Sequence, residues 1–174
     1  MMNKLSIIIL LIGTSEFIQS QPPQENSAEL EKRNGFKSIR LATSIDSVAG
    51  ATFKKDILEK DEFPAKLYTV KDESLMKIGD VKVNSVTLKT YKDLVYEIEV
   101  NTDKDQRLMR GMEKALGKSI YNVRTKAYHW RAESLTLTFM GNKNSLTLIY
   151  KSYPVFKMMY ADRGKKIENI ADDF

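Results

Sequence analysis

The amino-acid sequence predicts an α+β fold, in which an antiparallel sheet carries helices on one face. Two observations support this fold class. Segment 103–118 has apolar residues at helical spacing, and segments on both sides of it have apolar residues at every second position, the period of a half-buried strand. Short turns join these strands, which favours antiparallel pairing. The sheet is therefore expected to be covered by the central helix.

The central helix is predicted over Asp103–Lys118. Its apolar side has the i, i+1, i+4, i+7, i+8 spacing of a face that packs on a core, and it consists of Leu108, Met109, Met112, Ala115 and Leu116. Asp103 and Gln106 have the spacing of a capping box, and Gly117 is expected to end the helix.

The remaining elements follow from the same periodicities. Strands are predicted over 65–70, 81–90, 94–100, 127–133, 134–140 and 145–151. A bulge is expected near Asn84–Ser85, and Gly141–Asn144 is a hairpin turn. In the third of these strands, Glu97 and Glu99 are expected to face away from the core.

Before the first of these strands, 36–41 suggests a short strand, and Thr43 with Asp46 predicts a short helix over 43–49. Segment 54–62 is charged and is expected to form a loop or a frayed turn of helix. The order of elements suggests two halves, each a helix followed by three strands, which are alike in topology only.

The N-terminal segment Met1–Ser20 predicts a signal peptide. Lys4 precedes the nearly continuous apolar run Leu5–Ile12, which is too short to span a bilayer. A membrane anchor or a buried strand is the alternative. Cleavage after Ser20 would place the mature protein in the periplasm or outside the cell. The absence of cysteine excludes disulfides and lipid attachment to a cysteine.

Three further regions follow the signal peptide. Residues 21–34 are polar, contain two prolines and predict a flexible linker. Residues 35–153 are expected to form a single α+β domain. Residues 154–174 are apolar enough to predict a partly ordered C-terminal tail, such as a terminal helix.

Few residues offer catalytic chemistry. There is no cysteine, and His129 is the only histidine. Few side chains are therefore available as metal ligands, and only His129 could serve in a Ser-His-acid triad. No phosphate-binding or dinucleotide-binding loop is present, and we expect neither a metal nor a cofactor. Paired carboxylates brought together by the fold remain open as hydrolytic groups.

The clearest candidate site is basic. The 174-residue chain has a net charge of +5, and residues 101–174 contain 14 Lys and Arg against 8 Asp and Glu. The candidate binding face lies opposite the apolar side of the central helix and extends beyond it, and it consists of Arg107, Arg110, Lys114, Lys118, Arg124, Lys126 and Arg131. A solvated face that keeps the protein soluble is the simpler explanation.

Three classes of partner suit a basic face. Tyr121 and Tyr128 lie among the cations, which is the composition of a single-strand nucleic-acid surface. An exported protein rarely meets nucleic acid, so we expect no nucleic-acid partner. An acidic protein or an anionic polymer of the cell envelope is the better expectation, and the sequence does not indicate the oligomeric state.

Residues 35–44, Gly-Phe-Lys-Ser-Ile-Arg-Leu-Ala-Thr-Ser, resemble the opening of small exported proteins common in Bacteroidetes. In those proteins a Gly-Phe-basic-x-Ile-x-x-Gly-Thr/Ser pattern leads into a short helix, and Ala42 stands here where the pattern has glycine. The resemblance implies an envelope location and no particular activity. The helix-then-sheet arrangement is also similar in outline to small periplasmic inhibitor and assembly modules.

Two functions are therefore expected. The first is an exported, non-enzymatic binding protein that recognises an acidic protein or an anionic envelope component, for example as an inhibitor or immunity-type protein. The alternative is a carboxylate-dependent hydrolase of the cell envelope. A cleft with convergent acids would favour the hydrolase.

Overall fold

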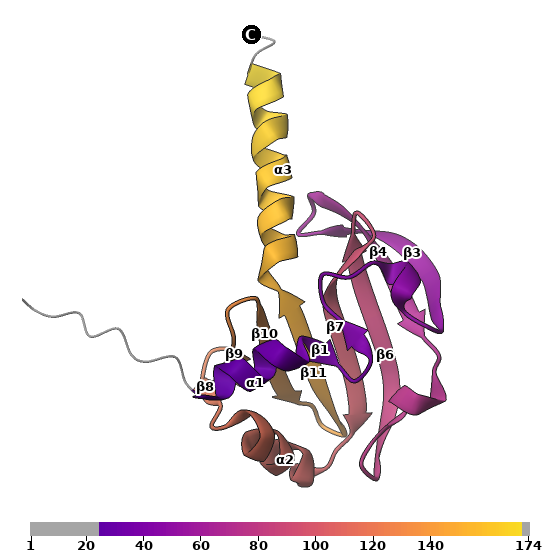
Figure 1. Ribbon diagram of the computed structural model, residues 1–174, viewed down its shortest axis with the longest axis vertical. Helices are drawn as coiled ribbons and strands as arrows, with labels where there is room; N and C mark the ends of the chain where they lie inside the picture. Colours follow the sequence, from indigo (N-terminus) through magenta and orange to yellow (C-terminus); the bar gives the residue numbers. More distant parts are fainter. Residues whose placement is uncertain (1–24, 172–174) are drawn as a thin grey trace, which may run out of the picture.

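The computed structural model describes residues 25–171 (Figure 1). The predicted signal peptide and residues 21–24 lie outside the described residues. The α+β class with an antiparallel sheet is confirmed. The main sheet has nine strands, β3 (Ala51–Glu59), β4 (Phe63–Val70), β5 (Lys77–Ile78), β6 (Val81–Tyr91), β7 (Leu94–Asp103), β8 (Ile120–Asn122), β9 (Ala127–Arg131), β10 (Leu135–Gly141) and β11 (Ser145–Ser152). Their order is β3-β4-β6-β7-β11-β10-β9-β8, and β5 pairs with β6.

Each half of the main sheet is a run of consecutive strands, and the last strands of the two halves, β7 and β11, pair at its centre. A helix follows each run: α2 (Gln106–Leu116) after β7 and α3 (Tyr153–Ala171) after β11. The predicted bulge is present, since the pairing of β6 with β7 shifts between Val83 and Ser85. The predicted hairpin turn between β10 and β11 is also present.

The prediction of a loop over 54–62 is wrong for most of that segment, which belongs to β3. This strand lies at one edge of the sheet and pairs only with β4. Most of its side chains are therefore exposed, including Lys54 and Lys55 beside a register shift. Charged side chains and irregular pairing are common at free sheet edges, where they oppose edge-to-edge association. The sequence of β3 does not predict a strand because its apolar residues do not alternate with polar ones.

The prediction of a flexible linker over 21–34 is wrong for residues 25–33, which form helix α1 (Glu25–Arg33). Leu30 is only 1% exposed and belongs to the core. Glu29 and Arg33 form an i, i+4 ion pair at 2.6 Å, and the Asn34 N–H donates to the Leu30 carbonyl oxygen at 3.0 Å. Burial of one leucine and the favourable ion-pair spacing hold this polar segment in a helix.

The central helix is confirmed, but its N-cap is not Asp103, which ends β7. Asp105 is the N-cap, and its carboxylate accepts the Arg107 backbone N–H at 2.8 Å. Gly117 ends the helix as predicted, with φ of +79° and its N–H bonded to the Glu113 carbonyl oxygen. Leu108 and Leu116 are buried on the apolar side.

The segment before β3 is less regular than predicted. Instead of one strand over 36–41, the chain makes a small hairpin of β1 (Gly35–Phe36) and β2 (Ile39–Arg40). Instead of a helix over 43–49 there is one 3₁₀ turn, Ile45–Ser47, whose N-cap is Ser44. A second 3₁₀ turn, Glu73–Leu75, precedes β5.

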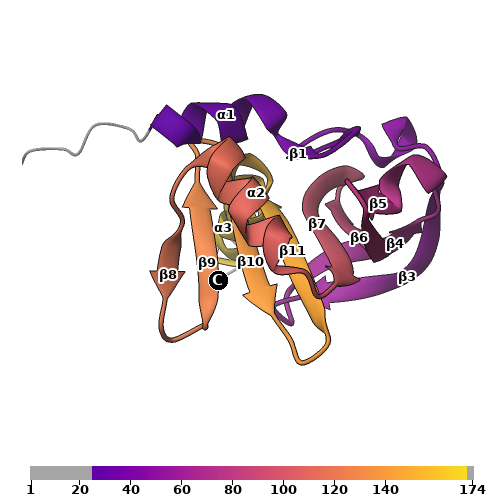
Figure 2. The same cartoon turned by 90° about the horizontal axis from the view of Figure 1, so that it is seen from below.

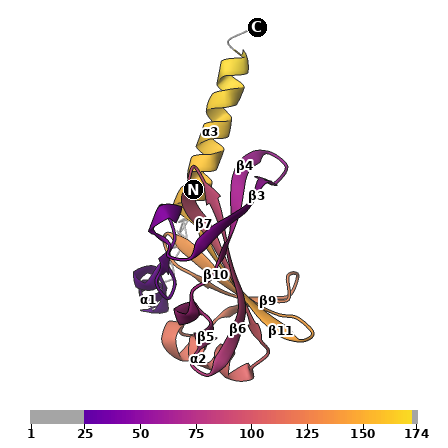
Figure 3. The same ribbon diagram turned by 90° about the vertical axis from the view of Figure 1, so that its right-hand side faces the viewer.

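The helices lie on both faces of the sheet, not on one. Helices α1 and α2 pack on the main core, which contains Leu30, Leu108, Leu137 and Leu148 (Figures 2 and 3). The first turns of α3 cover the other face through a second core, which consists of Phe63, Ala65, Tyr91, Tyr96, Val155 and Met159. The chain turns directly from β11 into α3, which brings the last helix to the face opposite α2.

In the described residues, the contacts that anchor helix α3 to the sheet come from its first turns and its middle. Asp162 accepts a hydrogen bond from the Tyr91 hydroxyl at 2.8 Å and pairs with Lys92 at 2.6 Å, and Arg163 pairs with Glu62 at 3.3 Å. Beyond these contacts the helix extends away from the sheet (Figure 1). Pro154 is tolerated because the first turn of a helix needs no N–H donor there. Within residues 25–171, none of the helices has the length and apolar content needed to cross a bilayer.

We expect stability to fall above pH 10, partly because of Tyr91. Burial and the hydrogen bond to Asp162 raise the pKa of Tyr91 from 10.0 to about 12. A group whose pKa is raised by folding contributes stability below its unfolded pKa and loses it as the pH rises toward the folded pKa. Between pH 9 and 11.5, the free energy of unfolding measured in urea should therefore fall less steeply with pH for Tyr91→Phe than for the wild type. Identical pH profiles for Tyr91→Phe, the wild type and a control, Tyr121→Phe, would contradict this expectation.

Candidate functional site

A cavity of about 560 Å³ opens on the face of the sheet that carries α1 and α2. It lies between the β1–β2 hairpin, the β5–β6 turn and helix α2, above strands β10 and β11. Small-molecule sites in proteins usually measure about 300–1,000 Å³. The cavity is therefore large enough to take a ligand.

The floor and walls of the cavity are apolar. Alternate residues of β10 and β11 point toward it, and the apolar side of α2 forms one wall. The apolar lining consists of Phe36, Ile78, Val81, Leu108, Met112, Ala115, Leu116, Leu137 and Leu148. The stripe that sequence analysis predicted to cover the sheet thus also lines an open space.

Cations surround this apolar space. Arg33, Lys37, Arg40 and Arg107 all line the cavity, whereas Asp80 is the only carboxylate among the described residues that does so. Arg33 is paired with Glu29. In the described part of the chain Lys37 and Arg40 have no carboxylate partner; the Lys37 ammonium donates to the Ser74 carbonyl oxygen at 2.5 Å.

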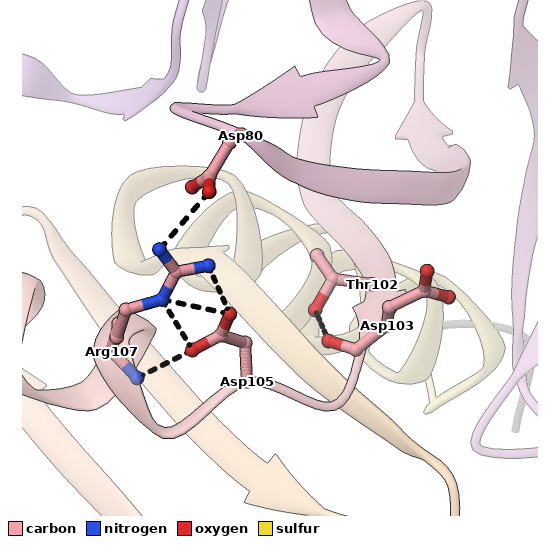
Figure 4. Close-up of polar contacts among 5 residues, drawn as sticks. All are labelled: Asp80, Thr102, Asp103, Asp105 and Arg107. Atoms are coloured by element: carbon pink, nitrogen blue, oxygen red, sulfur yellow. Dashed lines mark hydrogen bonds and ion pairs between the residues drawn. The ribbon is translucent and has the colours of Figure 1, made fainter.

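Arg107 joins two walls of the cavity (Figure 4). Its guanidinium pairs with Asp105 at 2.6 Å within α2 and with Asp80 at 3.0 Å on the β5–β6 turn. Hydrogen bonds from the side chain and the backbone of Arg107 lower the pKa of Asp105, and the same carboxylates raise the pKa of Arg107. Two carboxylates therefore neutralise this cation. Gly79, with φ of +62°, makes the tight turn that presents Asp80.

Within the part of the chain that the structure describes, Tyr150 supplies the only hydroxyl group of a lining side chain. It is 8% exposed, and its ring lies 6.4 Å from that of Phe36. Burial raises the pKa of Tyr150, which keeps the hydroxyl neutral at physiological pH. The cavity therefore has a neutral hydrogen-bonding group on its floor and cations at its rim.

Gly111 leaves room where α2 faces the cavity. A Cβ atom added to it would have no atom within 4 Å. The same is true of Gly164, the only glycine within α3. Glycine disfavours the interior of a helix by about 1 kcal/mol relative to alanine. Gly111 therefore preserves cavity volume at a position where helix propensity favours a larger residue.

The structure divides the predicted basic face. Of its seven residues only Arg107 lines the cavity. The others are exposed on two elements, with Arg110 and Lys114 on α2, Lys118 just after it, and Arg124, Lys126 and Arg131 on the β8–β9 hairpin. The prediction that they form one binding surface stays a prediction.

Sequence reasoning missed the contribution of residues 33–40 to the site. Because residues 21–34 are predicted to be a linker, Arg33 is not among the predicted site residues. The prediction of a short strand over 36–41 likewise assigns no binding role to Phe36, Lys37 or Arg40. A usable signal was present, because Leu30 lies within a run of good helix formers and Glu29 stands four residues before Arg33.

Among residues 25–171, the ring nitrogens of His129 have no carboxylate partner of the kind that a catalytic triad needs. Its ring nitrogens lie 3.1 Å from the Thr138 hydroxyl and 3.4 Å from the Thr125 hydroxyl, and neither contact is a carboxylate. Burial and the nearby Arg131 lower the pKa of His129. Over residues 25–171 no group of three His, Cys, Asp or Glu residues is arranged to hold a metal ion.

No family model matches this chain, and neither a curated protein nor a solved structure matches it. The resemblance of residues 35–44 to exported Bacteroidetes proteins therefore stays a prediction. The candidate site is defined by its geometry alone, as an apolar cavity with a cationic rim.

Proposed function

We propose that this chain is an exported, non-enzymatic binding protein whose cavity takes an amphipathic anion, with an apolar body of the fatty-acyl type and one anionic head group. The apolar floor under a cationic rim is the observation that carries the proposal. Export rests on the signal-like segment at residues 1–20.

The apolar lining favours an acyl chain. Each methylene group removed from water contributes about 0.8 kcal/mol. Polar or planar ligands would need several convergent hydrogen-bonding groups, and Tyr150 is the only hydroxyl side chain on the floor. The body of the ligand is therefore a flexible apolar chain.

The rim favours an anionic head group. Lys37 and Arg40 form no ion pair with a carboxylate of the described residues. Lys37 donates to the Ser74 carbonyl oxygen, and Arg40 donates to the carbonyl oxygens of Lys37 and Ile39. A ligand carboxylate or phosphate would replace these neutral acceptors with stronger, charge-assisted hydrogen bonds. Arg107 is held by Asp80 and Asp105 and forms part of the wall instead. The single carboxylate of the lining is thus engaged, which disfavours hydrolysis by paired acids in this cavity.

A cavity-filling variant tests the proposal. Gly111→Phe places a ring in the open space beside α2, and Gly164→Phe makes the same change on α3, away from the cavity. With dansyl-labelled undecanoic acid as the probe, we expect Gly111→Phe to lower the affinity at least tenfold while Gly164→Phe binds as the wild type does. The measurement is fluorescence titration, with circular dichroism to confirm that both variants fold.

A second arm of this titration tests the rim. The methyl ester of the probe keeps the chain and removes the charge, so its affinity for the wild type should be about tenfold lower. Failure of the wild type to bind the acid, or equal binding by both glycine variants, would refute the proposed function. Equal affinity for acid and ester would refute the role of the cations.

A further inference from the structure

The β8–β9 hairpin is basic throughout and lies apart from the cavity lining. Residues 118–132 contain four cations and no Asp or Glu, and the cations are Lys118, Arg124, Lys126 and Arg131. All four side chains are exposed, and none pairs with a carboxylate of the described residues. The hairpin therefore presents uncompensated positive charge.

The same hairpin exposes large apolar side chains. Val123 at its turn is 76% exposed, Ile120 is 56% exposed and Tyr121 is 48% exposed. Val123 lies directly beside Arg124, and Lys126 closes the turn with φ of +51°. Apolar side chains flanked by cations, without intervening acids, suit the boundary between anionic lipid head groups and acyl chains.

The fold holds this arrangement in place. Strand β8 pairs with β9 from Ile120 to Asn122, and the Asn122 side-chain oxygen accepts the backbone N–H groups of Arg124 at 2.9 Å and Thr125 at 3.3 Å. The rings of Tyr121 and Tyr128 contact each other at 4.8 Å. The hydrogen-bonded turn thus holds the Val123 side chain in its exposed position.

We propose that the β8–β9 hairpin docks this protein on a bilayer surface that contains anionic lipids. Val123 and Tyr121 enter the interfacial region, and Arg124 and Lys126 contact the head groups. A nucleic acid is disfavoured because the rings of Tyr121 and Tyr128 pack against each other at an interplanar angle of 49°, which covers part of the ring surface that bases would need. A protein partner is disfavoured because a narrow hairpin end offers little of the roughly 800 Å² that each side of a stable interface buries.

This proposal goes beyond the proposed function, because none of the hairpin residues lines the cavity. Membrane docking can fail while the acid probe still binds, and probe binding can fail while docking persists. The two proposals therefore have separate tests.

Sedimentation with vesicles tests the charge. The vesicles contain phosphatidylcholine alone or with about a third phosphatidylglycerol. We expect the wild type to bind only the anionic vesicles, and Arg124→Gln/Lys126→Gln to bind them about thirtyfold more weakly. The matched control, Lys165→Gln/Lys166→Gln on the exposed end of α3, should bind as the wild type does. All proteins share one N-terminus, so its contribution cancels.

A second pair of variants tests the apolar contact. Val123→Asp should weaken binding to the anionic vesicles at least tenfold, whereas Ile167→Asp, at a similarly exposed position on α3, should change it by no more than about threefold. Thermal melts of all variants should coincide, because the changed side chains are exposed. Absence of wild-type binding, equal losses in matched variants, or binding to an acidic polypeptide or RNA but not to vesicles would overturn the proposal.

Discussion

Replacing Leu30 by alanine is expected to destabilise the protein by about 2–5 kcal/mol. Leu30 is 1% exposed and joins α1 to the main core, so its truncation removes apolar burial and leaves a cavity. The measurement is the free energy of unfolding from urea titration. Leu58→Ala is the control, because Leu58 is 59% exposed on the edge strand β3 and its truncation should change stability by less than about 0.5 kcal/mol.

The Leu30 result decides what residues 25–33 contribute. A change as small as that of Leu58→Ala would mean that this segment behaves as the linker that its composition suggests. A large change would establish α1 as part of the domain. Because α1 carries Arg33 to the cavity rim, Leu30→Ala should then also weaken binding of the acid probe.

Glu97→Gln is the second substitution with a large expected effect, about 3 kcal/mol. Glu97 is 3% exposed and lies between two lysines, at 3.1 Å from the Lys89 ammonium and 3.0 Å from that of Lys151. Lys89 also pairs with Glu59 at 3.1 Å, and the Tyr96 hydroxyl donates to Glu59 at 2.9 Å. The residues of this charge cluster come from β3, β6, β7 and β11, on the face of the sheet that α3 partly covers.

The size of the effect follows from the loss of a buried charge. Glutamine keeps the shape of Glu97, but two lysines then face each other without the carboxylate between them. Removal of one partner from a buried ion pair typically destabilises by 3–5 kcal/mol, and the partial exposure of both lysines favours the lower end. Burial opposes the charge on Lys89, but the carboxylates of Glu97 and Glu59 outweigh it and raise the pKa of Lys89.

Urea unfolding of Glu97→Gln and Glu99→Gln checks this reasoning. Glu99 lies two residues along the same strand, is partly exposed and has no cation partner in the described residues. Its substitution should change stability by less than about 0.5 kcal/mol. If the two substitutions had equal effects, the charge cluster would contribute nothing to the fold.

Local sequence patterns predicted the elements that bury a regular stripe. Helix α2 was recognised because its apolar residues recur at helical spacing, and Gly117 was recognised as its end. The bulge between Val83 and Ser85 was visible because the apolar alternation changes phase there. In such elements the spacing of apolar residues within a short segment is enough to indicate which side faces the core.

Periodicity does not predict elements that bury few apolar side chains or that bury charged side chains. Strand β3 has an edge position and few buried side chains, so it shows no alternation. Glu97 was expected in solvent because a carboxylate is rarely buried, yet two lysines from neighbouring strands compensate it. A register shift in the pairing with β6 places Tyr96 on the same face as Glu97 and supplies the hydroxyl for Glu59. Such pairings depend on strands that are distant in sequence.

The sequence by itself determined the fold class, the central helix and most strands. The periodicity of apolar residues is a local property, so it can be recognised without knowing which elements pack against a segment. Tertiary structure alone decided the candidate site. The cavity takes its rim from residues 33–40, one wall from the β5–β6 turn, another from α2 and its floor from β10 and β11. Nothing within any one of these segments specifies that they converge, because the convergence results from strand order and from the packing of α1 and α2 on the same face of the sheet.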